Sequence, residues 1–134
     1  MSNLAIETLS LGRSFGSNIA VGGVDIAVRK GEIYGFLGPN GAGKSTTVRM
    51  LCTLLRPTSG AAKVAGFDVM DTPEKVRLRI GVAMQEAALD DKQSGREILE
   101  FQGRLFGLDA KPRRERVEKA IHLADIGDSI DDWV

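Results

Sequence analysis

The chain has 134 residues and 18 basic against 18 acidic side chains, so its formal net charge is zero. This length suits a single domain with a real core, and the even charge balance argues against a nucleic-acid partner or an anionic membrane surface. No apolar run approaches the length of a membrane span, and residues 1–5 lack the features of a signal peptide, so a cytoplasmic location is expected.

The first half of the chain predicts strands on both sides of a glycine-rich loop. Residues 6–11 and 24–28 alternate between apolar and polar side chains, as half-buried strands do, and the glycine-bearing stretch 12–23 is predicted to connect them. Residues 33–37 read as a short buried strand that runs into the loop. A helix is expected after the loop, ending before Arg56, because the residue before Pro57 is disfavoured in a helix. The lone Cys52 in this helix is expected to be a small buried hydrophobic residue.

The second half predicts further alternation of strand and helix. Residues 61–65 and 80–84 are expected as strands, and residues 73–79 as a short helix. Ser94 and Glu97 form a capping-box pattern that opens a helix ending at Gly107. That helix places four side chains on one face: Ile98, Phe101, Gln102 and Leu105. A last helix is expected over residues 112–124. Strands and helices interleaved in this way predict an α/β fold with a parallel sheet.

The loop itself carries the most specific chemistry in the chain. It matches the P-loop pattern G-x-x-x-x-G-K-[ST] with the residues Gly38, Pro39, Asn40, Gly41, Ala42, Gly43, Lys44, Ser45 and Thr46. Its glycines allow the backbone amides to turn toward phosphate oxygens at the start of the following helix. Lys44 supplies an ammonium for the β- and γ-phosphates, and the hydroxyl of Ser45 is placed to bind Mg²⁺. The pattern therefore predicts that the chain binds a nucleoside triphosphate.

Two other nucleotide-binding patterns fit less well. A dinucleotide fingerprint would need a third glycine where Thr46 stands, and it would leave Lys44 unexplained. A GTPase would need an N-K-x-D motif, but no asparagine in the sequence is followed by lysine.

Residues 37–47 resemble the Walker A segment of ATP-binding-cassette (ABC) ATPases. Phe15 matches the position of the family's A-loop aromatic, and Gln85 matches its Q-loop glutamine. The resemblance implies that Phe15 stacks on adenine, whereas Gln85 contacts Mg²⁺ and the attacking water and faces the membrane partner. It therefore implies ATP and Mg²⁺ as cofactors, catalytic roles for Lys44 and Gln85, and Ser45 and Gln85 as Mg²⁺ ligands.

The resemblance also implies an organisation and partners. The fold expected is an incomplete P-loop NTPase fold of the ABC ATPase type. It has antiparallel strands in 1–35 and 61–70, the P-loop and its helix in 36–56, the Q-loop strand region in 73–93, and the start of a helical subdomain in 94–134. Residues 86–108 are similar to the daunorubicin-resistance branch, whose ATP-binding subunits export drugs or other hydrophobic compounds. The implied partners are a membrane permease, on its cytoplasmic face, and a second ATPase subunit in a head-to-tail dimer.

Several parts of the family's hydrolytic machinery are not found in these 134 residues. The sequence contains no L-S-G-G-Q-type signature, no Walker B strand ending in Asp-Glu and no switch histidine. Phosphoryl transfer needs an oriented water as well as a positioned phosphate, so this chain alone is expected not to hydrolyse ATP and to bind it weakly or not at all. In the family's fold, the strands that lie between residues 33–37 and 80–84 belong to the missing half, so the chain alone is also expected to fold poorly. The leading interpretation is the N-terminal part of a transport-coupled ATPase. A natural non-hydrolytic half-domain is the main alternative, and a soluble ABC protein acting on ribosomes or in DNA repair is a third.

Overall fold

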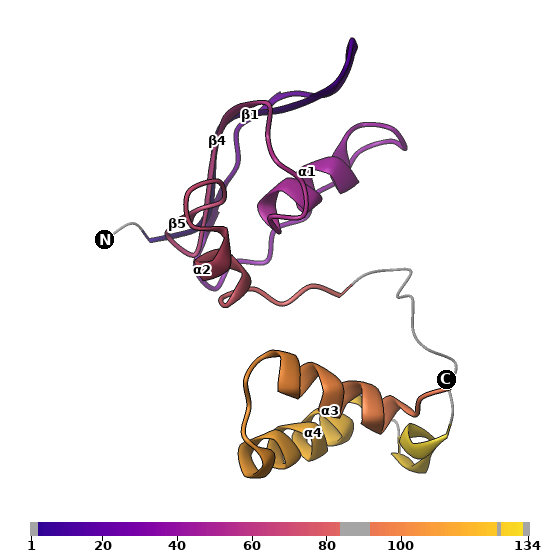
Figure 1. The fold of residues 1–134 in the computed structure, drawn as a ribbon. Helices are drawn as coiled ribbons and strands as arrows, with labels where there is room; N and C mark the ends of the chain where they lie inside the picture. The colour runs from indigo at the N-terminus through magenta and orange to yellow at the C-terminus, as the bar shows by residue number, and fades with distance from the viewer. Residues whose placement is uncertain (1–2, 84–91, 126, 133–134) are drawn as a thin grey trace. The chain divides into compact units, whose positions relative to one another are not determined.

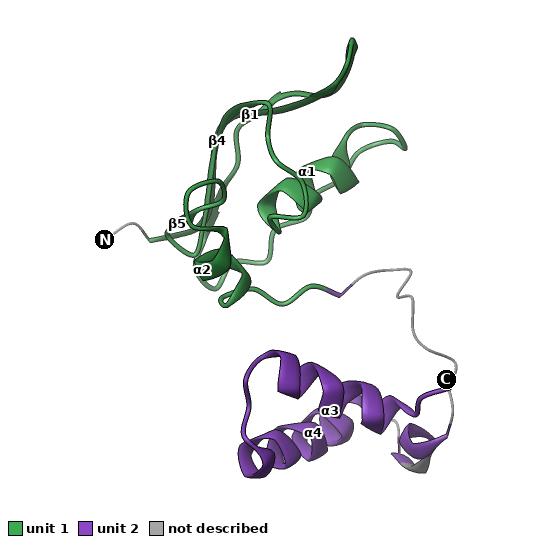
Figure 2. Ribbon diagram, viewed as in Figure 1, with its two compact units in different colours: residues 1–82 green, residues 83–134 purple. Residues whose placement is uncertain are grey.

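The computed structural model describes residues 3–83, 92–125 and 127–132. The chain divides into two compact units, Met1–Val82 and Ala83–Val134 (Figure 2). Each unit has its own secondary structure and its own buried residues, and each is described here by itself.

The first unit is built on an antiparallel sheet, part of which is labelled in Figure 1. Its strand order is β2-β1-β4-β5, and β3 pairs with β1 beside this path. All four strand pairings are antiparallel. The strands are β1 (Leu4–Phe15), β2 (Asn18–Val24), β3 (Ala27–Arg29), β4 (Ser59–Val64) and β5 (Phe67–Asp68).

Two helices, α1 (Lys44–Leu51) and α2 (Pro73–Arg77), supply the remaining core of this unit. Met50 of α1 and Val76 of α2 are fully buried, as is Leu11 of β1. These three side chains belong to one apolar cluster, whose other buried members are Val21, Ala62, Val64 and Val69. The core therefore fixes the helix that follows the P-loop against the antiparallel strands.

The N-terminal hairpin differs from the sequence prediction. The stretch 12–23, predicted as a connection, is mostly strand, because β1 continues to Phe15 and β2 begins at Asn18. The predicted strand 24–28 is divided instead between β2 and β3. Thr8 explains the division, since its side-chain hydroxyl donates to the Val24 carbonyl and accepts from the Ile26 amide, each at 2.7 Å. These two bonds satisfy the backbone groups where the chain turns between the strands.

The two strands predicted for a parallel core are not formed among the described residues. Residues 33–37 and 80–83 have no regular secondary structure, and Met84 lies outside the described residues. A strand is defined by hydrogen bonds to a neighbouring strand, and neither segment pairs with a strand of the described sheet. Ile33 and Leu37 are consequently 100% and 92% exposed, although their residue types favour burial.

The second unit contains α3 (Gly95–Leu105), α4 (Ala110–Ala124) and the 3-10 helix η1 (Gly127–Asp131). The predicted capping box is confirmed: the Ser94 hydroxyl accepts from the Glu97 amide at 3.3 Å, and the Ser94 amide donates to the Glu97 carboxylate at 2.9 Å. Val117 of α4 and Ile130 of η1 are buried. A Cβ at Gly95 would lie 2.7 Å from the Cδ1 atom of Ile130, so glycine permits the close approach of η1 to α3.

The remaining helix boundaries also differ from the prediction. α1 ends at Leu51 rather than just before Arg56, so Cys52 follows the helix and is only half-buried. α4 begins at Ala110 rather than at residue 112, and α2 ends at Arg77 rather than at residue 79. The predicted apolar face of α3 is not covered within the described part of the chain, because Phe101 and Leu105 are 51% and 65% exposed. Among the described residues, no helix has both the length and the apolar character needed to cross a membrane.

Candidate functional site

The P-loop joins residue 37 to helix α1 in the first unit. Gly41 and Gly43 have φ angles of 84° and 82°, in the left-handed region that favours glycine. The amide of Ala42 donates to the Pro39 carbonyl at 3.2 Å, which closes a tight turn. Two of the three loop glycines thus have the left-handed conformation that the glycine spacing predicts, whereas Gly38 does not.

Gly43 also anchors the loop to the sheet. A Cβ at this position would lie 2.5 Å from the Ala20 carbonyl oxygen and 2.9 Å from the Cγ2 atom of Val21. Both neighbours belong to β2. The base of the loop therefore lies directly on the second strand of the N-terminal hairpin, and only a residue without a side chain fits there.

Lys44 folds back over the loop. Its ammonium donates to the carbonyl oxygens of Gly38 and Pro39, the second at 2.6 Å. The side chain is partly exposed, and both acceptors are neutral backbone groups. An anion held by the loop can compete for this ammonium, because hydrogen bonds to charged acceptors are stronger than those to neutral ones.

The first turn of α1 is open to an anionic ligand. In the described part of the chain, no side chain caps the helix start at Gly43, and the first turn contains no acidic residue. Among the described residues, no acidic group or cap therefore neutralises the positive end of the helix dipole. Ser45 is exposed and Thr46 is partly exposed on this turn, whereas Thr47 is buried and its hydroxyl donates to the Gly43 carbonyl at 3.0 Å.

Phe15, the predicted base-stacking residue, lies at the end of β1, where it pairs with Asn18 of β2. Phe15 is 48% exposed, so part of the residue is accessible to a ligand. The Arg13 guanidinium lies 4.5 Å from the ring centroid. Sequence analysis did not single out Arg13, although residues two apart on a strand share one face of the sheet.

The structure brings most of the predicted site residues into one unit. Phe15 and the loop residues from Gly38 to Thr46 all lie in the first unit, and β2 connects them through its contacts with Phe15 and Gly43. Gln85 lies outside the described residues. Its predicted role as a catalytic residue and Mg²⁺ ligand stays a prediction.

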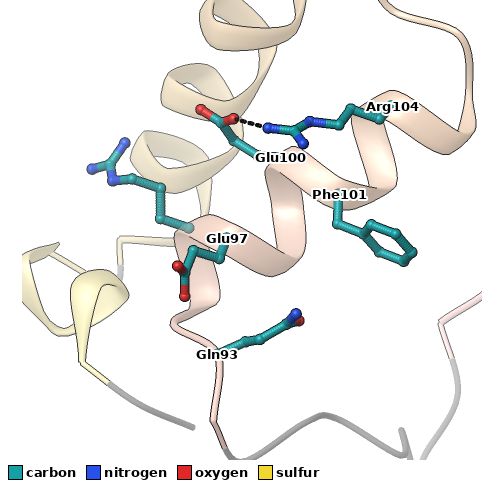
Figure 3. Close-up of a pocket in the computed structure, with 6 residues that line it drawn as sticks. Gln93, Glu97, Glu100, Phe101 and Arg104 are labelled. Atoms are coloured by element: carbon teal, nitrogen blue, oxygen red, sulfur yellow. Dashed lines mark ion pairs between the residues drawn. The ribbon is translucent and has the colours of Figure 1, made fainter.

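A pocket lies on the second unit, along α3. It is lined by Gln93, Arg96, Glu97, Glu100, Phe101 and Arg104 (Figure 3). The side chains of Glu100 and Arg104 point toward one another, with an ion-pair distance of 3.6 Å between the carboxylate and the guanidinium (Figure 3). The two residues are one helical turn apart and solvated, so they form a surface ion pair rather than part of a catalytic site. Among the described residues, no group of three or more His, Cys, Asp or Glu side chains could hold a metal ion.

Comparison with known proteins places the loop in a family context. The chain is 48% identical over 127 residues to the daunorubicin/doxorubicin resistance ATP-binding protein DrrA of Streptomyces peucetius. The match spans 95% of this chain but only 38% of that relative's length. The two proteins therefore correspond over almost all of this chain and over less than half of the relative.

Solved structures show the same fold. The ATP-binding subunit of an ABC transporter superposes with a TM-score of 0.83 at 23% identity, over 96% of this chain and 54% of that one. The ATP-binding cassette MJ0796, solved as a dimer with ADP and Pi, gives a TM-score of 0.79 at 21% identity, over 96% of this chain and 60% of that one. The mixed α/β fold expected from the sequence is thus confirmed. The family model described as ABC transporter matches residues 21–134, and the chain belongs to that family.

Proposed function

We propose that this chain binds ATP as part of the ATP-binding subunit of an ABC transporter that exports drugs or other hydrophobic compounds. The observation that carries the proposal is the geometry of the P-loop. Lys44 folds back onto the carbonyls of Gly38 and Pro39. Gly41 and Gly43 are left-handed, and no described side chain caps the helix start. The choice of an export system rests on the similarity to DrrA, a daunorubicin/doxorubicin resistance protein.

The proposed binding mode assigns a role to each part of the site. The loop amides and the start of α1 hold the phosphates, and Lys44 leaves the carbonyls of Gly38 and Pro39 to bind the β- and γ-phosphate oxygens. Phe15 offers its exposed ring to the base. Pro39 and Asn40 shape the mouth of the loop, where both are exposed.

The residues around the loop also fit a magnesium ion. Mg²⁺ keeps several waters and takes few protein ligands besides the phosphates, so a site for it needs little more than one well-placed hydroxyl. The exposed Ser45 supplies that hydroxyl on the first turn of α1. When bound, the ion neutralises part of the phosphate charge. Gln85 is proposed as the second protein ligand from its position in the sequence.

The proposed partners follow from the family. The intact subunit would work with a membrane permease from its cytoplasmic face and pair head to tail with a second ATPase subunit. The dimeric state of the cassette MJ0796 supports the second part of this proposal. Hydrolysis would take place in that assembly, with Lys44 and Gln85 acting on the γ-phosphate and the attacking water.

The test compares two lysine variants of the full-length native polypeptide. Lys44→Ala is expected to weaken binding of a fluorescent ATP analogue at least tenfold, since an ion–phosphate hydrogen bond is worth about 1.5–3 kcal/mol. Lys111→Ala, on the exposed start of α4, is the matched control and should bind normally. Equal affinities for the two variants would refute the P-loop assignment. Tight ATP binding without turnover, in the presence of the permease, would favour the non-hydrolytic half-domain.

A further inference from the structure

Arg13 occupies an unusual position at the end of β1. Its guanidinium stands over the Phe15 ring, with 4.5 Å between the guanidinium carbon and the ring centroid. A cation at this distance is attracted to the electron-rich face of an aromatic ring. The ring is therefore held from one side, while 48% of the Phe15 surface remains exposed.

The guanidinium is itself held in place by the segment that follows the P-loop helix. Arg13 Nη1 donates to the Arg56 carbonyl at 2.8 Å, and Arg13 Nε is buried with no hydrogen-bond partner among the described residues. A buried donor without a partner costs free energy. The attraction between the guanidinium and the Phe15 ring offsets that cost. We therefore take the position of Arg13 to be set by the ring as well as by the Arg56 carbonyl.

Neighbouring bonds hold the same two segments together. The Ser14 amide donates to the Thr58 hydroxyl at 3.0 Å, and the Thr58 amide donates to the Gly12 carbonyl at 2.9 Å. The end of β1 is thus joined to residues 56–58, which follow α1, at three separate points. Phe15 and the helix of the P-loop are connected through this junction.

From this geometry we infer that Arg13 is a positioning residue for nucleotide binding. It holds the Phe15 ring on one face and thereby presents the opposite face to the adenine base. The inference rests on the proposed function, because it needs Phe15 to meet the base. It assigns Arg13 to the base-binding half of the site and gives it no contact with the phosphates.

The experiment separates the two halves of the ligand. Binding of Mg-ATP and of inorganic tripolyphosphate, which has no base, is measured for the full-length polypeptide and its variants. Arg13→Met keeps an unbranched apolar stem but removes the guanidinium cation. It is expected to weaken ATP binding about two- to fivefold, the effect of one exposed cation–π contact, and to leave tripolyphosphate binding unchanged.

Three further variants make the result specific. Arg56→Met removes a neighbouring exposed charge but keeps the carbonyl that Arg13 uses, so it should bind ATP normally. Arg13→Lys keeps a cation within reach of the ring and should retain most of the ATP affinity. This variant also tests the inference if Arg13→Met does not fold. In a Phe15→Ala background, Arg13→Met should cause no additional loss, because the ring it positions is gone.

The outcomes distinguish failure of the inference from failure of the proposed function. Equal loss of ATP and tripolyphosphate binding in Arg13→Met would show a structural role only, and no loss of either would also overturn the inference. An additional loss in the Phe15→Ala background would mean that Arg13 acts on something other than the ring. By contrast, Lys44→Ala should lose both ligands, and unchanged binding there would overturn the proposed function itself.

Discussion

The Arg96 side chain donates from Nε to the Asp131 carboxylate at 2.6 Å and also pairs with Glu118, so one guanidinium joins α3 to both η1 and α4. The hydrogen bonds to Asp131 and Glu118 raise the pKa of Arg96 further above its usual high value, so the group stays charged at every accessible pH. All three side chains are partly solvated, so the link should weaken as salt is added.

Replacement of Arg96 by Met should loosen η1 from the helix pair. Amide hydrogen exchange over residues 127–131 is expected to become faster, and the difference from wild type should shrink at high salt. Arg116→Met, on the exposed side of α4, is the control and should exchange as wild type does. Unchanged protection of residues 127–131 in Arg96→Met would mean that Ile130 packing alone holds η1.

Two glycine substitutions should separate backbone strain from steric overlap. Gly41 and Gly43 have nearly the same φ, but no heavy atom lies within 4 Å of a Cβ built at Gly41, whereas one at Gly43 meets the Ala20 carbonyl at 2.5 Å. Gly41→Ala is expected to cost about 1–2 kcal/mol. Gly43→Ala should cost roughly 3 kcal/mol, because the overlap with β2 is added. Urea denaturation of the full-length polypeptide measures both, and equal values would contradict the contact with β2.

The capping box at the start of α3 gives a third prediction. Ser94→Ala removes the hydroxyl that accepts from the Glu97 amide and should destabilise the second unit by about 1 kcal/mol. Asp109 stands at the start of α4 without a side-chain capping bond, so Asp109→Ala should have a smaller effect. Circular dichroism during thermal unfolding of the full-length polypeptide provides the comparison. A larger loss for Asp109→Ala would show that the helix dipole outweighs the cap.

Cys52 should react slowly with alkylating reagents. Burial raises the pKa of its thiol, and the thiolate is the reactive form, so the reactive fraction at neutral pH lies below that of a free cysteine. Iodoacetamide labelling followed by mass spectrometry should be slower in the folded protein than in urea, and faster as the pH is raised. Equal rates in both states would mean that Cys52 is not shielded by the fold.

The exposed apolar side chains of Ile33 and Leu37 give a prediction about the isolated chain. Side chains of this type in a segment without strand partners favour association, so the purified 134-residue chain should bind a hydrophobic dye and aggregate. Cooperative unfolding with well-dispersed amide resonances would contradict this expectation.

The mass of the native polypeptide in its source cells provides a related test. An immunoblot against this segment is expected to show a band at least twice the 14.4 kDa of this chain, since the match to DrrA covers 38% of that relative. A band at the mass of the chain itself would favour the half-domain interpretation and would direct attention to what it binds.

The features that the sequence predicts well are those set by residues close together in the chain. The P-loop turn depends on its own glycines and on Lys44, and the α3 start depends on Ser94 and Glu97 three residues later. Local geometry and hydrogen bonding decide both, so the pattern of residue types is sufficient.

The features that the sequence predicts poorly depend on distant partners. Strand β1 extends through the glycine at position 12 because residues 18–24 pair with it. The irregular register of this pairing accommodates the polar and small side chains that suggested a loop. Residues 33–37 have a strand-like composition, but composition cannot supply the neighbour that a strand needs. The contact between Arg13 and Phe15 is an intermediate case, since the two residues are close in the chain but the register of β1 shifts between Arg13 and Ser14.

The contact between Gly43 and β2 has a genetic consequence. The atom that a Cβ at position 43 would meet first is a main-chain oxygen, and every amino acid at position 20 carries that oxygen in the same place. Mutation at codon 20 therefore cannot restore a protein damaged at codon 43. Suppressors of such a mutant should map to sites that shift the strand as a whole, and reversion to glycine should dominate any selection.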